Sequence, residues 1–125
     1  MNAAMVRTRR VLVAEMGRTY RSTDRDELCV LARKLSALVN SPDTAGVVVD
    51  LAGVEEFGAG LLGALVRLHA EAETLGKTVV LCGLSEHALT VLRLARLDTV
   101  WTLAPSRAEA TAAVGPGRIA ATAAL

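Results

Sequence analysis

Residues 46–63 read Gly-Val-Val-Val-Asp-Leu-Ala-Gly-Val-Glu-Glu-Phe-Gly-Ala-Gly-Leu-Leu-Gly, and this stretch decides the fold of the chain. The unbroken apolar run at 47–49 is typical of a strand covered on both faces of a sheet. A short loop and a glycine-rich segment follow, and leucines then repeat at helical spacing over residues 59–75. We therefore expect a buried strand, a loop and a helix in succession.

The remainder of the chain continues this alternation. Further strands are predicted at 10–16, 78–82 and 99–103, with a turn or second short strand at 17–22. Helices are predicted to begin near Thr23, Ser85 and Ser106, each of which has a side chain that can cap a helix. Alternating helices and strands joined by short loops favour parallel strands, so we expect the strands at 47–49 and 78–82 to be adjacent and parallel.

The predicted architecture is a single α/β domain. We expect a four- to five-stranded, mostly parallel (mixed) sheet with about four helices over residues 10–114. Residues 1–9 form an N-terminal segment in this prediction. Residues 115–125 form a flexible tail, because Gly115, Pro116 and Gly117 end the last helix.

The composition excludes several classes of function. The chain has 125 residues, a net charge of +1, and only Tyr20, Phe57 and Trp101 as aromatic residues. A balanced charge and few stacking side chains argue against nucleic-acid binding. No apolar run reaches the roughly 18 residues that span a bilayer, and no signal peptide is apparent. We therefore expect a cytoplasmic protein without direct membrane insertion.

The cysteines and histidines do not form a recognisable metal site. Cys29 and Cys82 lie in apolar surroundings and are expected to be reduced, buried and unbridged. His69 and His87 are isolated on separate predicted helices, where a surface or boundary position is expected. Two Cys and two His match no zinc spacing, so we expect no metal and no cofactor.

No residue set has the spacing of a catalytic site. Asp50 follows the strand at 47–49, where we expect its carboxylate to hold the loop at 51–57 by hydrogen bonds. Ser85 and Ser106 are interpreted as helix caps. Since no nucleophile, base and orienting group converge, we expect a protein that is not an enzyme.

Residues 58–63 spell G-x-G-x-x-G, the dinucleotide-binding pattern. The pattern requires a glycine directly after the strand and an acidic residue at the end of the next strand, and this chain has neither. We expect Gly63 to allow close helix packing. Gly58 and Gly60 are placed at a helix N-terminus, where free N–H groups favour an anion or a partner's polar group.

Two segments resemble the STAS domain, the fold of bacterial anti-sigma factor antagonists. Residues 47–61 read Val-Val-Val-Asp-Leu-Ala-Gly-Val-Glu-Glu-Phe-Gly-Ala-Gly-Leu, where family members read Asp-Leu-Ser-Gly-Val and then Asp-Ser-Ser-Gly-Leu. Residues 76–85 and 91–98 resemble a later strand of the family, the helix after it and a Leu-Asp turn. The resemblance covers about residues 10–114.

The resemblance implies binding to the ATPase-type kinase domain of an anti-sigma factor. In the family, phosphorylation of a serine in the Asp-Ser-Ser-Gly loop breaks that binding through added charge. Here Phe57 stands at the position of the acid, and Gly58 and Ala59 stand at the serine positions. No hydroxyl side chain lies between Val54 and Val66, so the resemblance implies a module without the usual phosphoserine switch.

We therefore predict a regulatory protein-interaction module of the anti-anti-sigma-factor type. Its partner would be an anti-sigma factor kinase-type ATPase domain or another STAS protein, a second copy of this chain included. Two alternatives are a scaffold subunit of a multi-STAS assembly and a protein that binds a small ligand or nucleotide. The predicted partner-binding residues are Phe57, Gly58, Ala59, Gly60, Leu61 and Leu62, with Asp24 at the rim.

Overall fold

The computed structural model describes residues 10–16, 25–54, 57–114 and 120–124 and shows a five-stranded sheet between helices. The strand order is β4-β3-β2-β1-β5, and every pairing in it is parallel. In chain order the elements are β1 (Arg10–Glu15), α1 (Arg25–Val39), β2 (Thr44–Asp50), α2 (Ala59–Leu75), β3 (Thr78–Cys82), α3 (Glu86–Leu94), β4 (Thr102–Ala104), α4 (Arg107–Val114) and β5 (Ala120–Ala124).

The predicted fold class is confirmed. The sheet and the four helices of the described residues have the expected α/β alternation. Strands β2 and β3 are neighbours and run parallel, with Val47 opposite Val79, as the sequence predicted. The expected cap at Thr23 and the turn or strand at 17–22 lie outside the described residues.

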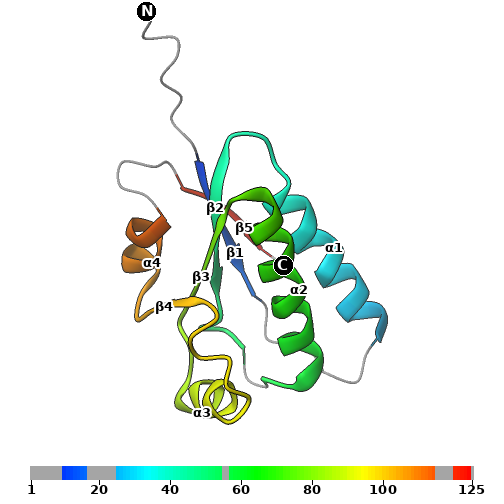
Figure 1. Cartoon of the computed structure of the whole chain (residues 1–125), viewed down its shortest axis with the longest axis vertical. Coiled ribbons are helices and arrows are strands. Elements are labelled where there is room, and N and C mark those ends of the chain that lie inside the picture. The colour runs from blue at the N-terminus through cyan, green and yellow to red at the C-terminus, as the bar shows by residue number, and fades with distance from the viewer. Residues whose placement is uncertain (1–9, 17–24, 55–56, 115–119, 125) are drawn as a thin grey trace, which may run out of the picture.

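Helices cover the two faces of the sheet unequally. Figure 1 shows α1 and α2 together on one face and the short helix α4 on the other. Alternate side chains of β2 pack on opposite faces of the sheet, because successive side chains of a strand point in opposite directions. Val47 and Val49 contribute to the larger core cluster, and Val48 to a smaller cluster with Ala110 of α4.

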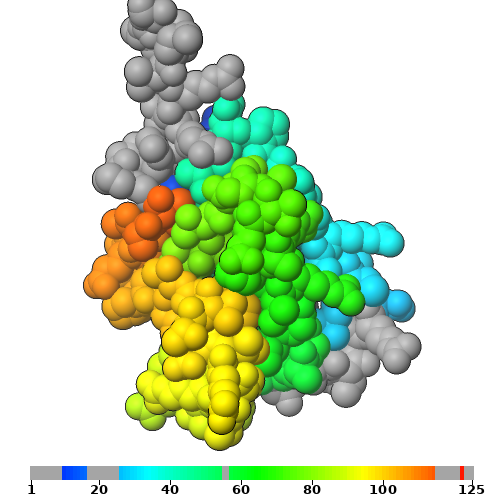
Figure 2. All heavy atoms as spheres, in the orientation of Figure 1, coloured from blue at the N-terminus to red at the C-terminus, as the bar shows by residue number. Residues whose placement is uncertain are grey.

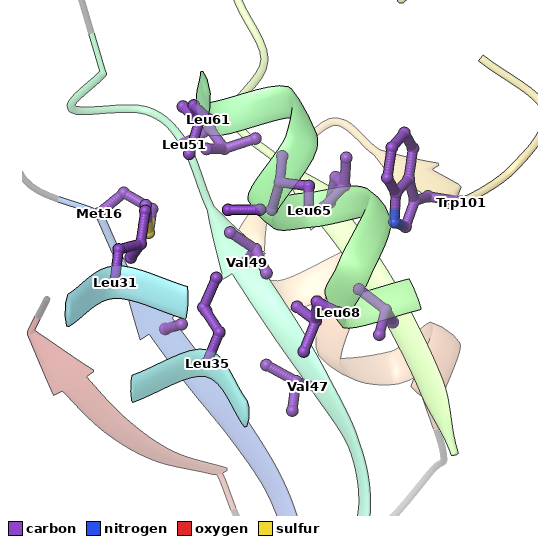
Figure 3. Close-up of a cluster of buried hydrophobic side chains, with 14 of the residues drawn as sticks. Met16, Leu31, Leu35, Val47, Val49, Leu51, Leu61, Leu65, Leu68 and Trp101 are labelled. Atoms are coloured by element: carbon purple, nitrogen blue, oxygen red, sulfur yellow. The ribbon is translucent and has the colours of Figure 1, made fainter. Parts of the chain in front are cut away.

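The larger core is mainly aliphatic, as the scarcity of aromatic residues predicted. Figure 3 shows Val47 and Val49 of β2 pointing toward leucines of α1 and α2. Leu31, Leu35 and Leu65 are at most 1% exposed. Because α1 and α2 both present this leucine-rich face to β2, the two helices pack against each other, and their outer surfaces adjoin in Figure 2.

The end of the chain differs from the prediction of a flexible tail over residues 115–125. Residues 120–124 form β5, which pairs with β1 in parallel from Val11 opposite Ala120 onward. Residues 115–119 and 125 lie outside the described residues. An alanine-rich segment can extend a sheet because the ladder is made by backbone groups, which the hydrophobic pattern does not report.

Two glycines of the 46–63 stretch have opposite surroundings. A Cβ atom added at Gly46 in β2 would collide with the backbone oxygen of Thr78 and come within 2.9 Å of Cγ1 of Val114. A Cβ atom added at Gly63 in α2 would meet nothing within 4 Å. The expectation that Gly63 permits close helix packing is therefore wrong, since this helix surface is open.

The two glycines give a matched stability prediction. Gly46→Ala should lower the free energy of unfolding by about 1–3 kcal/mol, because the new methyl group overpacks against backbone. Gly63→Ala should raise it by about 0.5–1 kcal/mol, because alanine favours the helix. Urea unfolding of both variants measures these changes. Equal effects of the two substitutions would contradict the packing described here.

Candidate functional site

The loop that leads from β2 to α2 is fixed at its start by Asp50. One carboxylate oxygen, Oδ1, accepts a hydrogen bond from the backbone N–H of Ala52 at 3.0 Å. The backbone N–H of Leu51 donates to the carbonyl of Cys82 at 2.9 Å, and that of Val54 donates to the carbonyl of Leu51 at 3.0 Å. The predicted role of Asp50 in holding this loop is confirmed for its first residues.

Asp50 also joins an ion-pair network that the sequence did not reveal. The Arg107 guanidinium donates to Oδ2 of Asp50 from Nε at 3.0 Å and from Nη2 at 2.7 Å. Nη2 also lies 2.7 Å from Oε2 of Glu15. Hydrogen bonds to Glu15 and Asp50 raise the pKa of Arg107 above its usual value. The network therefore ties the start of α4 to the carboxyl ends of β1 and β2.

The N-terminus of α2 has no side-chain cap. Gly58 is the N-cap residue with an extended backbone (φ −101°, ψ 176°), and its carbonyl accepts the first helical hydrogen bond from Leu62 at 3.0 Å. The first turn contains no acidic residue. Among the described residues, no side chain caps the amide groups of this turn, and Gly58 and Gly60 lie at the helix start as predicted.

The other two expected caps are present. Oγ of Ser85 accepts a hydrogen bond from the backbone N–H of Ala88 at 3.1 Å at the start of α3. Oγ of Ser106 accepts one from the backbone N–H of Glu109 at 3.2 Å at the start of α4. The uncapped start of α2 thus differs from the starts of α3 and α4.

Burial corrects part of the predicted partner-binding set. Phe57 is 5% exposed and Leu61 is 1% exposed, and both belong to the large core cluster. Both side chains fill the space beneath the start of α2, so these two members of the predicted partner-binding set do not present their side chains to a partner. Figure 3 shows Leu61 next to Leu51 in this region.

The remaining predicted residues are more accessible. Ala59 is exposed, and Gly58, Gly60 and Leu62 are half-buried. Asp24 lies outside the described residues. The role of these residues in partner binding remains a prediction.

A groove between α1 and α2 begins at this helix start. Its first section has a volume of about 260 Å³ and includes Cys29, Gly60 and Gly63 in its lining. A second section of about 300 Å³ reaches Ser36 and Glu71 and shares Ala32, Ala64 and Arg67 with the first. We did not predict this groove, although the closely spaced small residues of α2 were the available signal.

The two cysteines have different environments. Cys82 is 1% exposed, and burial, reinforced by the nearby charge of Asp50, raises the pKa of its thiol to about 11. Cys29 is exposed and lines the groove, so the expectation that both thiols are buried is wrong for Cys29. Both thiols are free.

The two histidines lie on separate helices at boundary and surface positions, as their places in the sequence indicated. His69 is half-buried in α2, where its ring packs edge-on against Trp101 at a centroid distance of 6.1 Å. Its Nε2 lies 3.5 Å from Oε1 of Glu73. His87 is exposed on α3.

The part of the chain that the structure describes contains no cluster of metal-ligating side chains and no helix that could span a membrane. In that part of the chain, no three His, Cys, Asp or Glu side chains gather in a way that could hold a metal ion. None of its helices combines the length and the apolar character needed to cross a bilayer.

The buried strand β2, the loop and the glycine-rich start of α2 follow one another as predicted, in the segment that resembles the STAS domain. The family sequence model described as "Mlab, STAS domain" matches residues 22–105, which is more than half of the chain. The chain belongs to the STAS domain family. A comparison with curated protein sequences gave no significant match.

Solved STAS structures have the same fold. An anti-sigma-factor antagonist (STAS) domain protein from Planctomyces limnophilus is 25% identical, with a TM-score of 0.65 over 76% of this chain and 86% of that one. The NMR structure of TM1081, a protein of Thermotoga maritima, has a TM-score of 0.70 at 19% identity over 82% and 81% of the two chains. The anti-sigma factor antagonist SpoIIAA, in its unphosphorylated form, has a TM-score of 0.57 at 11% identity over 83% and 87%.

The STAS chain should show one reactive thiol in the native state. Cys29 should react with a disulfide reagent such as DTNB within minutes, whereas Cys82 should react only after unfolding in urea, because it is buried and its pKa is about 11. Cys29→Ala should remove the fast reaction. Two thiols that react equally fast in the native protein would contradict the burial of Cys82.

The same pKa shift has a defined effect on stability. Because the thiol of Cys82 ionises at a higher pH in the folded protein than its ordinary value of 9.0, it favours the unfolded state as pH rises from 9.0 to about 11.

Proposed function

We propose that this chain is a non-enzymatic regulatory module of the anti-sigma factor antagonist type that works without a phosphoserine switch. The observation that carries the proposal is the α2 N-terminus of a STAS domain, uncapped at Gly58 and accessible at Ala59. Its partner is the kinase-type ATPase domain of an anti-sigma factor or another STAS protein, met in the bacterial cytoplasm. The similarity to the Planctomyces limnophilus antagonist supports this partner class.

The chemistry of the loop supports constitutive binding. Gly58 and Ala59 stand at the family's serine positions, and no Ser, Thr or Tyr lies between Val54 and Val66. A kinase therefore has no hydroxyl group to modify in this loop. Control of the complex would depend on the amounts of the two proteins or on a different surface.

The carboxylates near the loop support a role other than catalysis. Oδ2 of Asp50 is engaged by Arg107, and its Oδ1 accepts the N–H of Ala52. Both oxygens therefore have structural partners. The contacts of Asp50 with Arg107 and Ala52 therefore support a structural role for this carboxylate.

Two alanine-to-arginine substitutions test the proposal. Ala59 is exposed at the N-terminus of α2, and Ala112 is exposed on α4, on the opposite face of the sheet. Ala59→Arg should weaken binding to the purified cognate kinase domain by at least about tenfold, through bulk and charge at the contact centre. Ala112→Arg should leave it within about threefold, as surface changes outside an interface do. Equal binding by both variants, measured by titration calorimetry, would place the contact elsewhere.

Restoring serines should restore a switch. The extended backbone of Gly58 suits an N-cap serine, and Ala59 is exposed, so the double variant Gly58→Ser, Ala59→Ser should fold with an unchanged or slightly higher thermal midpoint. With the cognate kinase and labelled ATP, it should be labelled on an introduced serine and then bind more weakly. The wild type should take up no label within residues 54–66.

The acid of the family motif should not be restored with the serines. Phe57 is a core residue in this chain, and removal of a buried aromatic side chain costs about 3–5 kcal/mol. Phe57→Asp should therefore destabilise the fold. A folded double serine variant that binds the kinase but is never labelled would contradict the assignment of residues 58 and 59 to the serine positions.

A further inference from the structure

The groove between α1 and α2 has unpaired positive charge at its middle. Arg33 of α1 lines its second section, and Arg67 of α2 lines both sections. Both side chains are exposed, and neither has a hydrogen-bond or ion-pair partner among the described residues. In an otherwise balanced chain, these two arginines give one surface a local positive charge.

The acidic residue at the far end of the groove is already engaged. A carboxylate oxygen of Glu71, Oε2, accepts hydrogen bonds from Oγ of Ser36 at 2.9 Å and from Nδ2 of Asn40 at 2.7 Å. These contacts join α1 to α2 at this end of the groove. Glu71 therefore acts within the protein, while the arginines are left for a ligand.

The floor of the groove favours protein over nucleic acid as the occupant. Its lining combines the small residues Ala32, Ala59, Gly60 and Ala64 with Leu28 and Leu68, so a helix can come close and meet apolar side chains. The lining contains no aromatic side chain on which a base could stack. Two arginines also provide fewer positive charges than proteins generally use to bind the phosphate backbone of a nucleic acid.

The dimensions of the groove fit a short helix. Gly60 and Glu71 mark its ends on α2, and eleven residues at about 1.5 Å each give a length of about 16 Å, or about three helical turns. A helix seated in such a groove contacts it through residues spaced at i, i+3 or i+4 and i+7. Small or apolar residues would meet the floor, and carboxylates would meet the arginines.

We infer that the α1–α2 groove binds an acidic amphipathic helix of the protein partner, through ion pairs from Arg33 and Arg67. The groove begins at the α2 N-terminus, so this assignment rests on the proposed function and names the chemistry of the partner segment. The partner helix runs along the groove from Gly60 toward Glu71, and its carboxylates form bidentate pairs with the two guanidinium groups.

A charge reversal with a matched control tests the assignment. The double variant Arg33→Glu, Arg67→Glu should weaken binding to the purified cognate kinase domain by at least about tenfold, because like charges then face each other across the contact. Its affinity should also depend less on salt than that of the wild type. The control Lys34→Glu, Arg93→Glu makes the same change in net charge at exposed positions that do not line the groove, and should bind within about threefold of the wild type.

Cys29 provides a second measurement that identifies the partner segment. A photoreactive maleimide placed on this exposed thiol should cross-link, in the complex, to a helical segment of the kinase domain that carries Asp or Glu at helical spacing. A cross-linked segment that is basic or lacks carboxylates would overturn the inference. So would a mixed-sequence oligonucleotide that binds the wild type and not the arginine double variant, since the arginines would then serve nucleic acid.

The results separate the two proposals. Loss of binding in Ala59→Arg with full binding in Arg33→Glu, Arg67→Glu would remove the groove assignment and leave the proposed function intact. Full binding by Ala59→Arg and by the arginine double variant would contradict both the groove assignment and the proposed function. Absence of kinase-domain binding by the wild type would also contradict both.

Discussion

The structure depends on the burial of β2 on both faces of the sheet. Val47, Val48 and Val49 are fully buried, and they alternate between the core beneath α1 and α2 and the smaller cluster beneath α4. Burial of each such side chain contributes about 1.5–3 kcal/mol. Because β2 is the central strand, its register determines where the neighbouring strands end and where the loops to the helices begin.

The position of the α2 N-terminus follows from this strand. Asp50 ends β2, holds the start of the loop through Ala52 and is itself held by Arg107 from the opposite face of the sheet. Phe57 and Leu61 then anchor the start of α2 in the core. Of the residues at this helix start, Ala59 is exposed and Gly58, Gly60 and Leu62 are half-buried, so in the proposed complex the groove between α1 and α2 would supply most of the side chains that contact the partner.

Periodicity and apolar runs predicted most of the fold because the buried face of a helix or strand requires apolar residues at a fixed spacing along the chain. The helix spacing in α2 and the run at 47–49 were recognisable for this reason. The caps Ser85 and Ser106 were recognisable because each bonds to an amide only three residues further on. The contacts of Arg107 with Asp50 were not predictable, since 57 residues separate the two side chains. The burial of Phe57 depends on how the loop before α2 folds onto the core, which no local sequence pattern indicates. The formation of β5 depends on backbone pairing with β1, which side-chain periodicity does not indicate either.

Hydrogen exchange on the complex tests the central claim most directly. With the cognate kinase-type ATPase domain bound, amide protection should rise at the start of α2, in residues 58–67, and along α1 in residues 28–36, because these segments line the groove. Protection should not change in α3 or β4, which lie away from it. Protection that rises in α3 and β4, with none at the start of α2, would contradict the assignment of this surface to the partner.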